Sequence, residues 1–282
     1  MDHYDVSQDK DCFIKEVLES TATSLEKLGR SSFSVFYSNP WMTLEKGKYY
    51  IVGLNPGGAE KPSDRQDHAS LSVRYGADGK KDWSAYLVES EGEKWESALQ
   101  PNISAFANCC MAGGRESLRR IFSTNAIFAR SPDSSGIAGK KDELFNQSWP
   151  WHVKFLERVR PEIIIAISNR EGSSRSAYQL FSKHLEGVSP LGDPIEAYGT
   201  FSIKGQKGRY RLSSGPLDVR LIGLPHLSRW SPTSAKSAEA IAALKQRGWL
   251  DYPAPLEIET TSTTWSREDR GGGHGIRIDR TH

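Results

Sequence analysis

Cysteine is scarce in this chain, which restricts the metal and redox sites that it can hold. Only Cys12, Cys109 and Cys110 are present, and none has the CxxC spacing typical of zinc or iron–sulfur ligands. No cluster of histidines and carboxylates has ligand spacing either. We therefore predict reduced, structural thiols, no metal or iron–sulfur cluster, and no other cofactor.

Long apolar runs are also missing. No stretch approaches the roughly 20 apolar residues that span a bilayer. Residues 1–11 are acidic and polar, whereas a secretory signal is basic and then apolar. With 37% hydrophobic and 26% charged residues, the composition is that of a soluble globular protein. We expect a cytoplasmic monomer without membrane contact.

A net charge of +2 is too small to identify a nucleic-acid-binding protein, but the charge is unevenly distributed. Between Ser202 and Trp230 the only acid is Asp218. The basic residues of this stretch are Lys204, Lys207, Arg209, Arg211, Arg220 and Arg229. Such a stretch is either a solvated hairpin or a surface that faces phosphates, and we regard the two interpretations as equally supported.

Apolar periodicity predicts alternating strands and helices. Residues 161–168, PEIIIAIS, form an almost continuous apolar run, which is typical of a parallel strand covered by helices on both faces. Further strands are expected at 48–54, late in 118–128, at 200–212 and at 219–224. Helices are expected at 10–28, at 148–159 with Ser148 as cap and Pro150 in the first turn, at 173–185, and at 234–247. This alternation predicts an α/β domain.

We predict one domain over residues 1–258, followed by a flexible tail at 259–282 that is rich in Gly, Ser and Thr. Residues 59–114 lack a sustained period and are expected to be an inserted segment of loops and short helices. Its aromatic residues are Tyr75, Trp83, Tyr86 and Trp95.

Three short motifs follow predicted strands, at the end of an α/β sheet where ligands bind. GLNPGG occupies residues 53–58, STNAIF contains Asn125, and LPHLSRWS occupies residues 224–231. Each also has a purely structural interpretation: a Pro-Gly turn, an asparagine that satisfies loop backbone, and a structural histidine.

In this order the motifs resemble the uracil-DNA glycosylase superfamily, in particular its mismatch-specific and single-strand-selective branches. Residues 53–57 match the GxNPG catalytic loop, Asn125 the base-reading asparagine, and His226 with Ser228 the late His-Pro-Ser loop. The resemblance implies a three-layer α/β/α sandwich with a central, mainly parallel sheet. It also implies that DNA is the partner, that Asn55 orients a water, and that Gly53 and Leu54 contact the base together with Asn125. Tyr75 of the inserted segment is a further candidate for contact with the base.

The resemblance further implies that His226 donates a hydrogen bond to the departing base and that Ser228 and Arg229 contact phosphates. Trp230 either fills the gap left by the flipped nucleotide or belongs to the core. If the basic stretch faces DNA, Lys207, Arg209 and Arg211 bind phosphates too. Leu227 stands where the family usually has proline, and Asn55 stands where the most active branch has aspartate.

These features predict a monofunctional DNA glycosylase that leaves an abasic site, because the motifs position no lysine for a Schiff base. The alternatives are a silent nucleic-acid-binding member of the fold and a phosphate-binding enzyme that uses GLNPGG as an anion loop. A Walker-type GxxxxGK[ST] is absent, which counts against the last alternative.

Uracil is the default substrate. The alternative is a bulky modified pyrimidine of viral DNA, excised in antiviral defence. It requires that the aromatic residues of the inserted segment and its polar run Asp64, Arg65, Gln66, Asp67 and His68 line a larger pocket.

Overall fold

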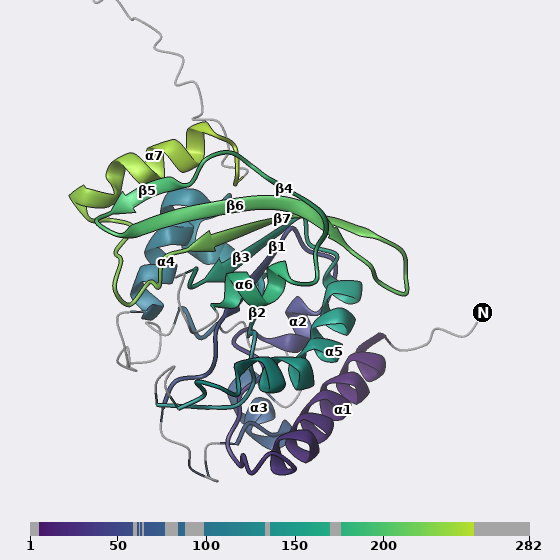
Figure 1. The fold of residues 1–282 in the computed structure, drawn as a ribbon. Coiled ribbons are helices and arrows are strands. Elements are labelled where there is room, and N and C mark those ends of the chain that lie inside the picture. The colour runs from purple at the N-terminus through teal and green to yellow at the C-terminus, as the bar shows by residue number, and fades with distance from the viewer. Residues whose placement is uncertain are drawn as a thin grey trace, which may run out of the picture. The chain divides into compact units, whose positions relative to one another are not determined.

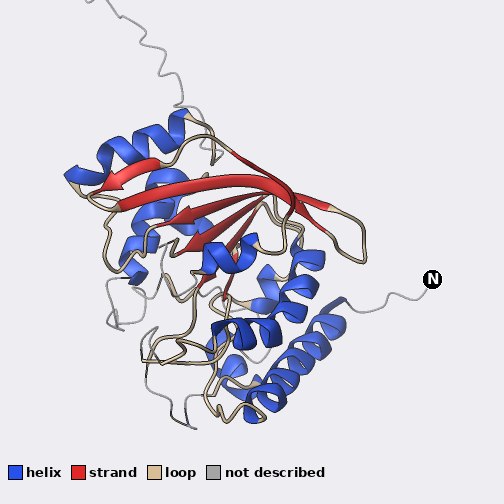
Figure 2. Cartoon of the chain, viewed as in Figure 1, coloured by secondary structure: helices blue, strands red, loops and turns tan. Residues whose placement is uncertain are grey.

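A mixed, mostly parallel β-sheet with helices on both faces forms the centre of the protein (Figures 1 and 2). The structure is a computed structural model. It describes residues 6–58, 61, 63, 65–76, 84–87, 99–132, 136–169 and 176–250. The predicted α/β class is confirmed, and the arrangement is consistent with the predicted three-layer sandwich.

Within the sheet the strand order is β2-β1-β3-β7-β6-β4, and β5 pairs with β6. The strands β2, β1, β3 and β7 run parallel, whereas β4, β5 and β7 are antiparallel to β6. The bounds are β1 Tyr49–Gly53, β2 Phe122–Asn125, β3 Ile163–Ile167, β4 Glu186–Pro190, β5 Ile195–Tyr198, β6 Phe201–Tyr210 and β7 Leu217–Leu224. The sequence did not predict β4 and β5 as separate strands.

The alternation of side chains along each strand separates two apolar clusters, one on each face of the sheet. Tyr50 and Val52 of β1 belong to the first cluster, together with residues of α1 (Val6–Glu26), α5 (Lys141–Val159) and α6 (Ala177–Ser182). Tyr49 and Ile51 belong to the second, with residues of α4 (Leu99–Cys110) and α7 (Ala238–Gln246). All five residues of β3 are buried, as its apolar run predicted.

The first and last predicted helices are confirmed. Helix α1 is followed by Gly29 with φ +69°, and the 3-10 turn Ala235–Ser237 and α7 are followed by Gly248 with φ +63°. Both glycines adopt the left-handed conformation expected after a helix C-terminus.

The predicted start of α5 at Ser148 is wrong. The helix begins at Lys141, so Ser148 lies inside it and donates a hydrogen bond to the carbonyl of Leu144. The preference of proline for a first helical turn suggested the later start. Pro150 is instead tolerated within α5. The buried face of this helix, which includes Leu144, Phe155 and Val159, packs against the core and stabilises it.

The inserted segment is attached to the domain through its described residues. It contains α3 (His68–Tyr75) and α4, in agreement with the expected short helices. Gln66 is 7% exposed; its Oε1 accepts hydrogen bonds from the backbone N–H groups of Val35 and Phe36, and its Nε2 donates to Phe36 O. Trp83, Trp95, Asp64 and the predicted tail at 259–282 lie outside the described residues.

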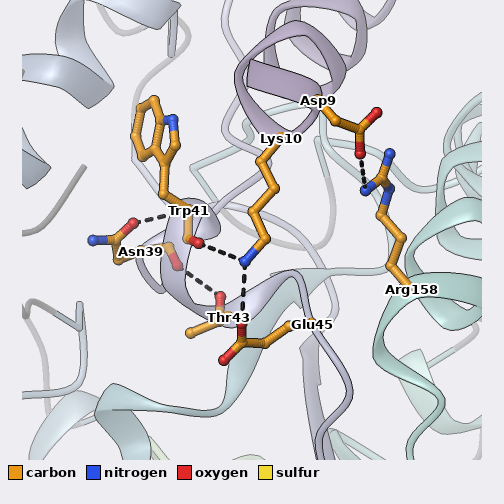
Figure 3. A network of polar contacts seen from close by, with 7 residues as sticks. All are labelled: Asp9, Lys10, Asn39, Trp41, Thr43, Glu45 and Arg158. Atoms are coloured by element: carbon orange, nitrogen blue, oxygen red, sulfur yellow. Dashed lines mark hydrogen bonds and ion pairs between the residues drawn. The ribbon is translucent and has the colours of Figure 1, made fainter. Parts of the chain in front are cut away.

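Polar contacts join α1 to α2 (Pro40–Thr43) and α5 (Figure 3). Lys10 Nζ donates to the carbonyl of Trp41 at 2.9 Å and pairs with Glu45 at 3.1 Å, while Arg158 pairs with Asp9 at 2.9 Å. The side chain of Asn39 accepts from Trp41 N and caps α2. No helix in the described part of the chain is long and apolar enough to cross a membrane.

Candidate functional site

The three sequence motifs lie at one edge of the sheet, because they follow parallel strands in matched register. Gly53 pairs with Asn125, Val52 pairs with Ala166, and Ile167 pairs with Leu224. The carboxyl ends of β2, β1, β3 and β7 are therefore level. Neighbouring strands are about 4.8 Å apart, so Gly53 and Leu224 lie roughly 10 Å from each other across β3. Asn55 lies two residues after Gly53, and His226 lies two residues after Leu224, so both follow the level strand ends at the same distance along the chain.

Hydrogen bonds join the GLNPGG loop to the segment after β2. The backbone N–H groups of Ala126, Ile127 and Ser131 donate to the carbonyls of Gly53, Leu54 and Pro56, respectively. Arg130 Nη1 donates to Gly57 O at 2.5 Å. These bonds hold the loop that carries Asn55 beside Asn125.

Asn125 packs directly over Gly53. A Cβ atom at Gly53 would collide with Asn125 Oδ1, so the close approach requires glycine. Asn125 is 6% exposed, and its Nδ2 makes no hydrogen bond of normal geometry with the described residues. A buried donor without a well-formed hydrogen bond is costly, so this amide is suited to a ligand that brings an acceptor.

Tyr37 is a site residue that the sequence analysis missed. Its backbone N–H donates to Ser123 O of β2, and its ring stacks on Tyr86 of the inserted segment with ring centroids 6.3 Å apart. Burial raises the pKa of the Tyr37 phenol, while the charge of Arg130 and a polar contact with Asn125 oppose the rise. The Tyr37 hydroxyl therefore lies near the Asn125 amide. No local motif marks this residue, because the contact joins segments distant in sequence.

His226 is half-buried and is held within its own loop. Its Nδ1 lies 3.3 Å from the backbone nitrogen of Ser228 and 2.7 Å from the Ser228 hydroxyl oxygen. Because a backbone N–H can only donate, Nδ1 is the acceptor and the proton of the neutral ring is on Nε2. Burial and, to a smaller extent, the charge of Arg229 lower the pKa of His226. The loop thus presents a neutral imidazole with an Nε2–H donor.

Of the two interpretations of Trp230, DNA wedge or core residue, the structure supports the core residue. Trp230 is 3% exposed and belongs to the second apolar cluster, as does Leu227. Asn102 of α4 donates from Nδ2 to the carbonyl of Leu227 at 2.6 Å, so the inserted segment also supports the His226 loop. Ser228 and Arg229 are exposed, as a contact with phosphate requires.

The residue after β3 has an unusual backbone conformation. Ser168 has φ +103°, which is rare for a residue other than glycine. Its N–H donates to Leu224 O, and the neighbouring Asn169 donates from Nδ2 to the carbonyls of Ser202 and Gly223. The strained residue lies between the Asn55 and His226 loops, and sequence patterns cannot reveal such strain.

The structure places Lys207, Arg209 and Arg211 far from the motif edge, so a phosphate contact by these residues would lie away from the three motifs. Lys207 pairs with Arg220 and Arg209 with Asp218 across β6 and β7, near the start of β7. Asp218 precedes Leu224 by six residues, or roughly 20 Å along a strand. Arg209 also forms an ion pair with Asp218 at 2.7 Å, and Arg211 forms one with Glu186 at 3.1 Å. A surface groove of about 690 Å³ lies at this remote end, lined by Lys207, Arg209 and Asp218 among others.

Most described polar residues of the inserted segment serve structural contacts. Asp67 caps α3, Arg65 pairs with Glu26, and His68 pairs with Asp11 at 2.6 Å. Tyr75, predicted to contact the base, is fully buried in the first apolar cluster and packs edge-on against Trp41. These residues do not line the site, whereas two other described residues of the segment contact it: Tyr86 through Tyr37, and Asn102 through the carbonyl of Leu227.

Within the described ranges, no group of three or more His, Cys, Asp or Glu side chains is arranged to hold a metal ion. Comparison of the sequence with protein-family models and with curated proteins found no match.

Proposed function

We propose that this protein is a DNA glycosylase with a fold like that of uracil-DNA glycosylases. The observation that carries the proposal is the level register of β2, β1, β3 and β7, which brings the asparagine loop, the base-reading amide and the histidine loop to one edge. A flipped base bound there contacts Asn125, Gly53 and Leu54, while Ser228 and Arg229 bind the DNA backbone.

Asn55 orients the water that attacks the sugar. Its Nδ2 donates to Pro56 O at 2.9 Å, which leaves Oδ1 as the atom that accepts a hydrogen bond from water. An amide is a weak base, so the reaction depends on departure of the base as an anion.

His226 stabilises that departing anion. The Nε2–H donor is already oriented because Nδ1 is held by Ser228. A donor aimed at the base oxygen stabilises the transition state more than the ground state, because negative charge develops there as the bond breaks. Arg130, whose guanidinium is close enough to affect Tyr37, adds positive charge beside the base.

The chemical step is a hydrolysis in which the sugar C1′–N bond breaks and its electron pair remains on the base. The water oxygen forms the new bond to C1′, and the proton that water loses neutralises the base anion. No lysine takes part, so the product is an abasic site.

Uracil remains the default substrate, since Asn125 offers one donor and one acceptor to a pyrimidine edge. A bulky modified pyrimidine stays the alternative, because the contact between Tyr86 and Tyr37 is one point at which the inserted segment can change the shape of the pocket.

The test is alkali-labile cleavage of DNA by the full chain, with uracil-containing oligonucleotides beside hypermodified viral DNA in the same salt. Asn55→Ala should abolish base release and leave DNA binding nearly intact, and Lys207→Ala is the control. Unchanged turnover in Asn55→Ala overturns the mechanism. DNA binding without release from any substrate favours the silent homologue, and binding of phosphate but not DNA favours the anion-loop enzyme.

A further inference from the structure

A buried chain of hydrogen bonds lies beneath the segment that carries Asn125. The hydroxyl of Tyr50 on β1 lies 2.8 Å from Nδ1 of His152 on α5, and Nε2 of His152 lies 3.0 Å from the carbonyl oxygen of Ala126. All three residues are fully buried. The chain connects a strand, a helix and the loop next to the base-reading residue.

Donor and acceptor rules determine the direction of this chain. A carbonyl oxygen only accepts, so His152 carries its proton on Nε2 and donates to Ala126. Nδ1 is then an acceptor, and the Tyr50 hydroxyl donates to it. Burial lowers the pKa of His152 to about 3, so the ring is neutral at ordinary pH and this arrangement persists.

The Ala126 peptide is held at both of its polar groups. Its N–H donates to Gly53 O of the catalytic loop, and its carbonyl accepts from His152. One helical turn before His152, the Ser148 hydroxyl accepts from the N–H of Phe128 at 3.3 Å. Helix α5 therefore bonds the backbone on the carboxyl side of Asn125 at two points.

Packing alone does not require histidine at this position. The ring of His152 has Phe128, Phe145 and Phe181 as neighbours, with centroids 5.1, 6.1 and 5.0 Å away. An apolar side chain would suit these neighbours, whereas a buried polar ring is costly unless both nitrogens are bonded. What distinguishes histidine from an apolar residue here is the hydrogen bond that it donates to Ala126 O and the one that it accepts from Tyr50.

We propose that His152 is a positioning residue for base recognition, which acts through the Ala126 peptide to hold the Asn125 amide over Gly53. This inference rests on the proposed function, in which Asn125 reads the base. His152 itself touches neither base nor sugar.

The test compares His152→Phe, His152→Gln and Tyr50→Phe with Tyr210→Phe. Tyr210 is the matched control, because it is also buried but its hydroxyl donates to the carbonyl of Phe181 and not to His152 or the segment after β2. Single-turnover base release in His152→Phe should fall roughly 10- to 100-fold, as expected for a misplaced contact. DNA affinity should change less than about twofold, because phosphate contacts remain.

Glutamine can donate to Ala126 O and accept from Tyr50, so His152→Gln should recover most of the rate. Tyr50→Phe should lower it less than His152→Phe, and Tyr210→Phe should leave it unchanged. Equal rates in wild type and His152→Phe overturn the proposal, as does an equal loss in Tyr210→Phe.

Hydrogen exchange of the 126–128 amides is a readout that does not require activity. Exchange should accelerate in His152→Phe and not in Tyr210→Phe. If wild type releases no base from any DNA, the proposed function fails. Unchanged exchange in His152→Phe would overturn the positioning role on its own.

Discussion

Asn125 lies so close over Gly53 that the strand end of β1 has no room for a side chain at that position. The two residues are paired in register on neighbouring parallel strands. The GLNPGG loop and Asn125 are therefore packed against each other, and a side chain at position 53 would displace the Asn125 amide.

Gly53→Ala should strongly reduce base release without unfolding the protein. The added methyl group would push the Asn125 amide from its position, and a displacement of about 1 Å costs roughly 100-fold in rate. Gly47→Ala is the control, because a Cβ there meets its nearest neighbour at an ordinary 3.7 Å. Single-turnover kinetics and melting curves separate the two effects. Full activity in Gly53→Ala would show that Asn125 does not read the base.

His226→Ala should remove one oriented donor and slow the chemical step. Loss of such donors typically raises the barrier by about 2.7–4 kcal/mol. Stability should change little, because the side chain is half-buried and bonds Ser228 of the same loop. Rapid-quench measurement of base release, beside the melting temperature, checks both statements. A large drop in melting temperature with normal turnover would favour a structural histidine.

The rate of base release should be constant above about pH 6.5 and fall in acid. His226 works as a neutral ring, and burial holds its pKa below the ordinary value of 6.5. As pH falls through this lowered pKa, Nδ1 takes up a proton and loses its bond from the Ser228 N–H. A pH–rate profile of single turnovers measures the effect. A rate that rises on acidification would contradict the neutral donor.

Stability should also fall in acid because of His152. Its pKa is about 3 in the folded protein against an ordinary 6.5, so the unfolded chain binds a proton first as pH decreases. Between these values the free energy of unfolding should lose up to about 1.4 kcal/mol per pH unit from this one group. Denaturant titrations at several pH values, with His152→Gln for comparison, measure the slope. Identical slopes in the wild type and in His152→Gln would contradict this contribution of His152 to the pH dependence of stability.

Neutralising Lys207, Arg209 and Arg211 together should leave the salt dependence of DNA binding unchanged, since these residues lie at the remote end of β6. Arg229→Ala should flatten the slope by about one charge. Binding titrations over a series of salt concentrations measure both slopes. A flattened slope in the triple variant would restore the phosphate-facing interpretation of the basic stretch.

Local patterns were sufficient for the elements whose formation depends on short-range chemistry. The apolar run of β3 predicted a buried strand, and the turn residues that follow β1 and β7 located both loops of the candidate site. The helix-stopping glycines at 29 and 248 were also evident, because a left-handed residue is a local requirement.

Tertiary structure decided the features that depend on strand direction and on contacts between distant segments. Lys207 and Arg209 belong to the same basic stretch of sequence as Arg229, but successive residues of the antiparallel strand β6 lie progressively farther from the motif edge. Trp230 lies in the core because it packs in one apolar cluster with residues of α4 and α7. Tyr37 lies near Asn125 because residues 32–38 form backbone hydrogen bonds with the segment around β2. Hydrophobic burial and backbone pairing across long sequence separations determine such positions. The periodicity of a single segment does not depend on these contacts and therefore cannot predict them.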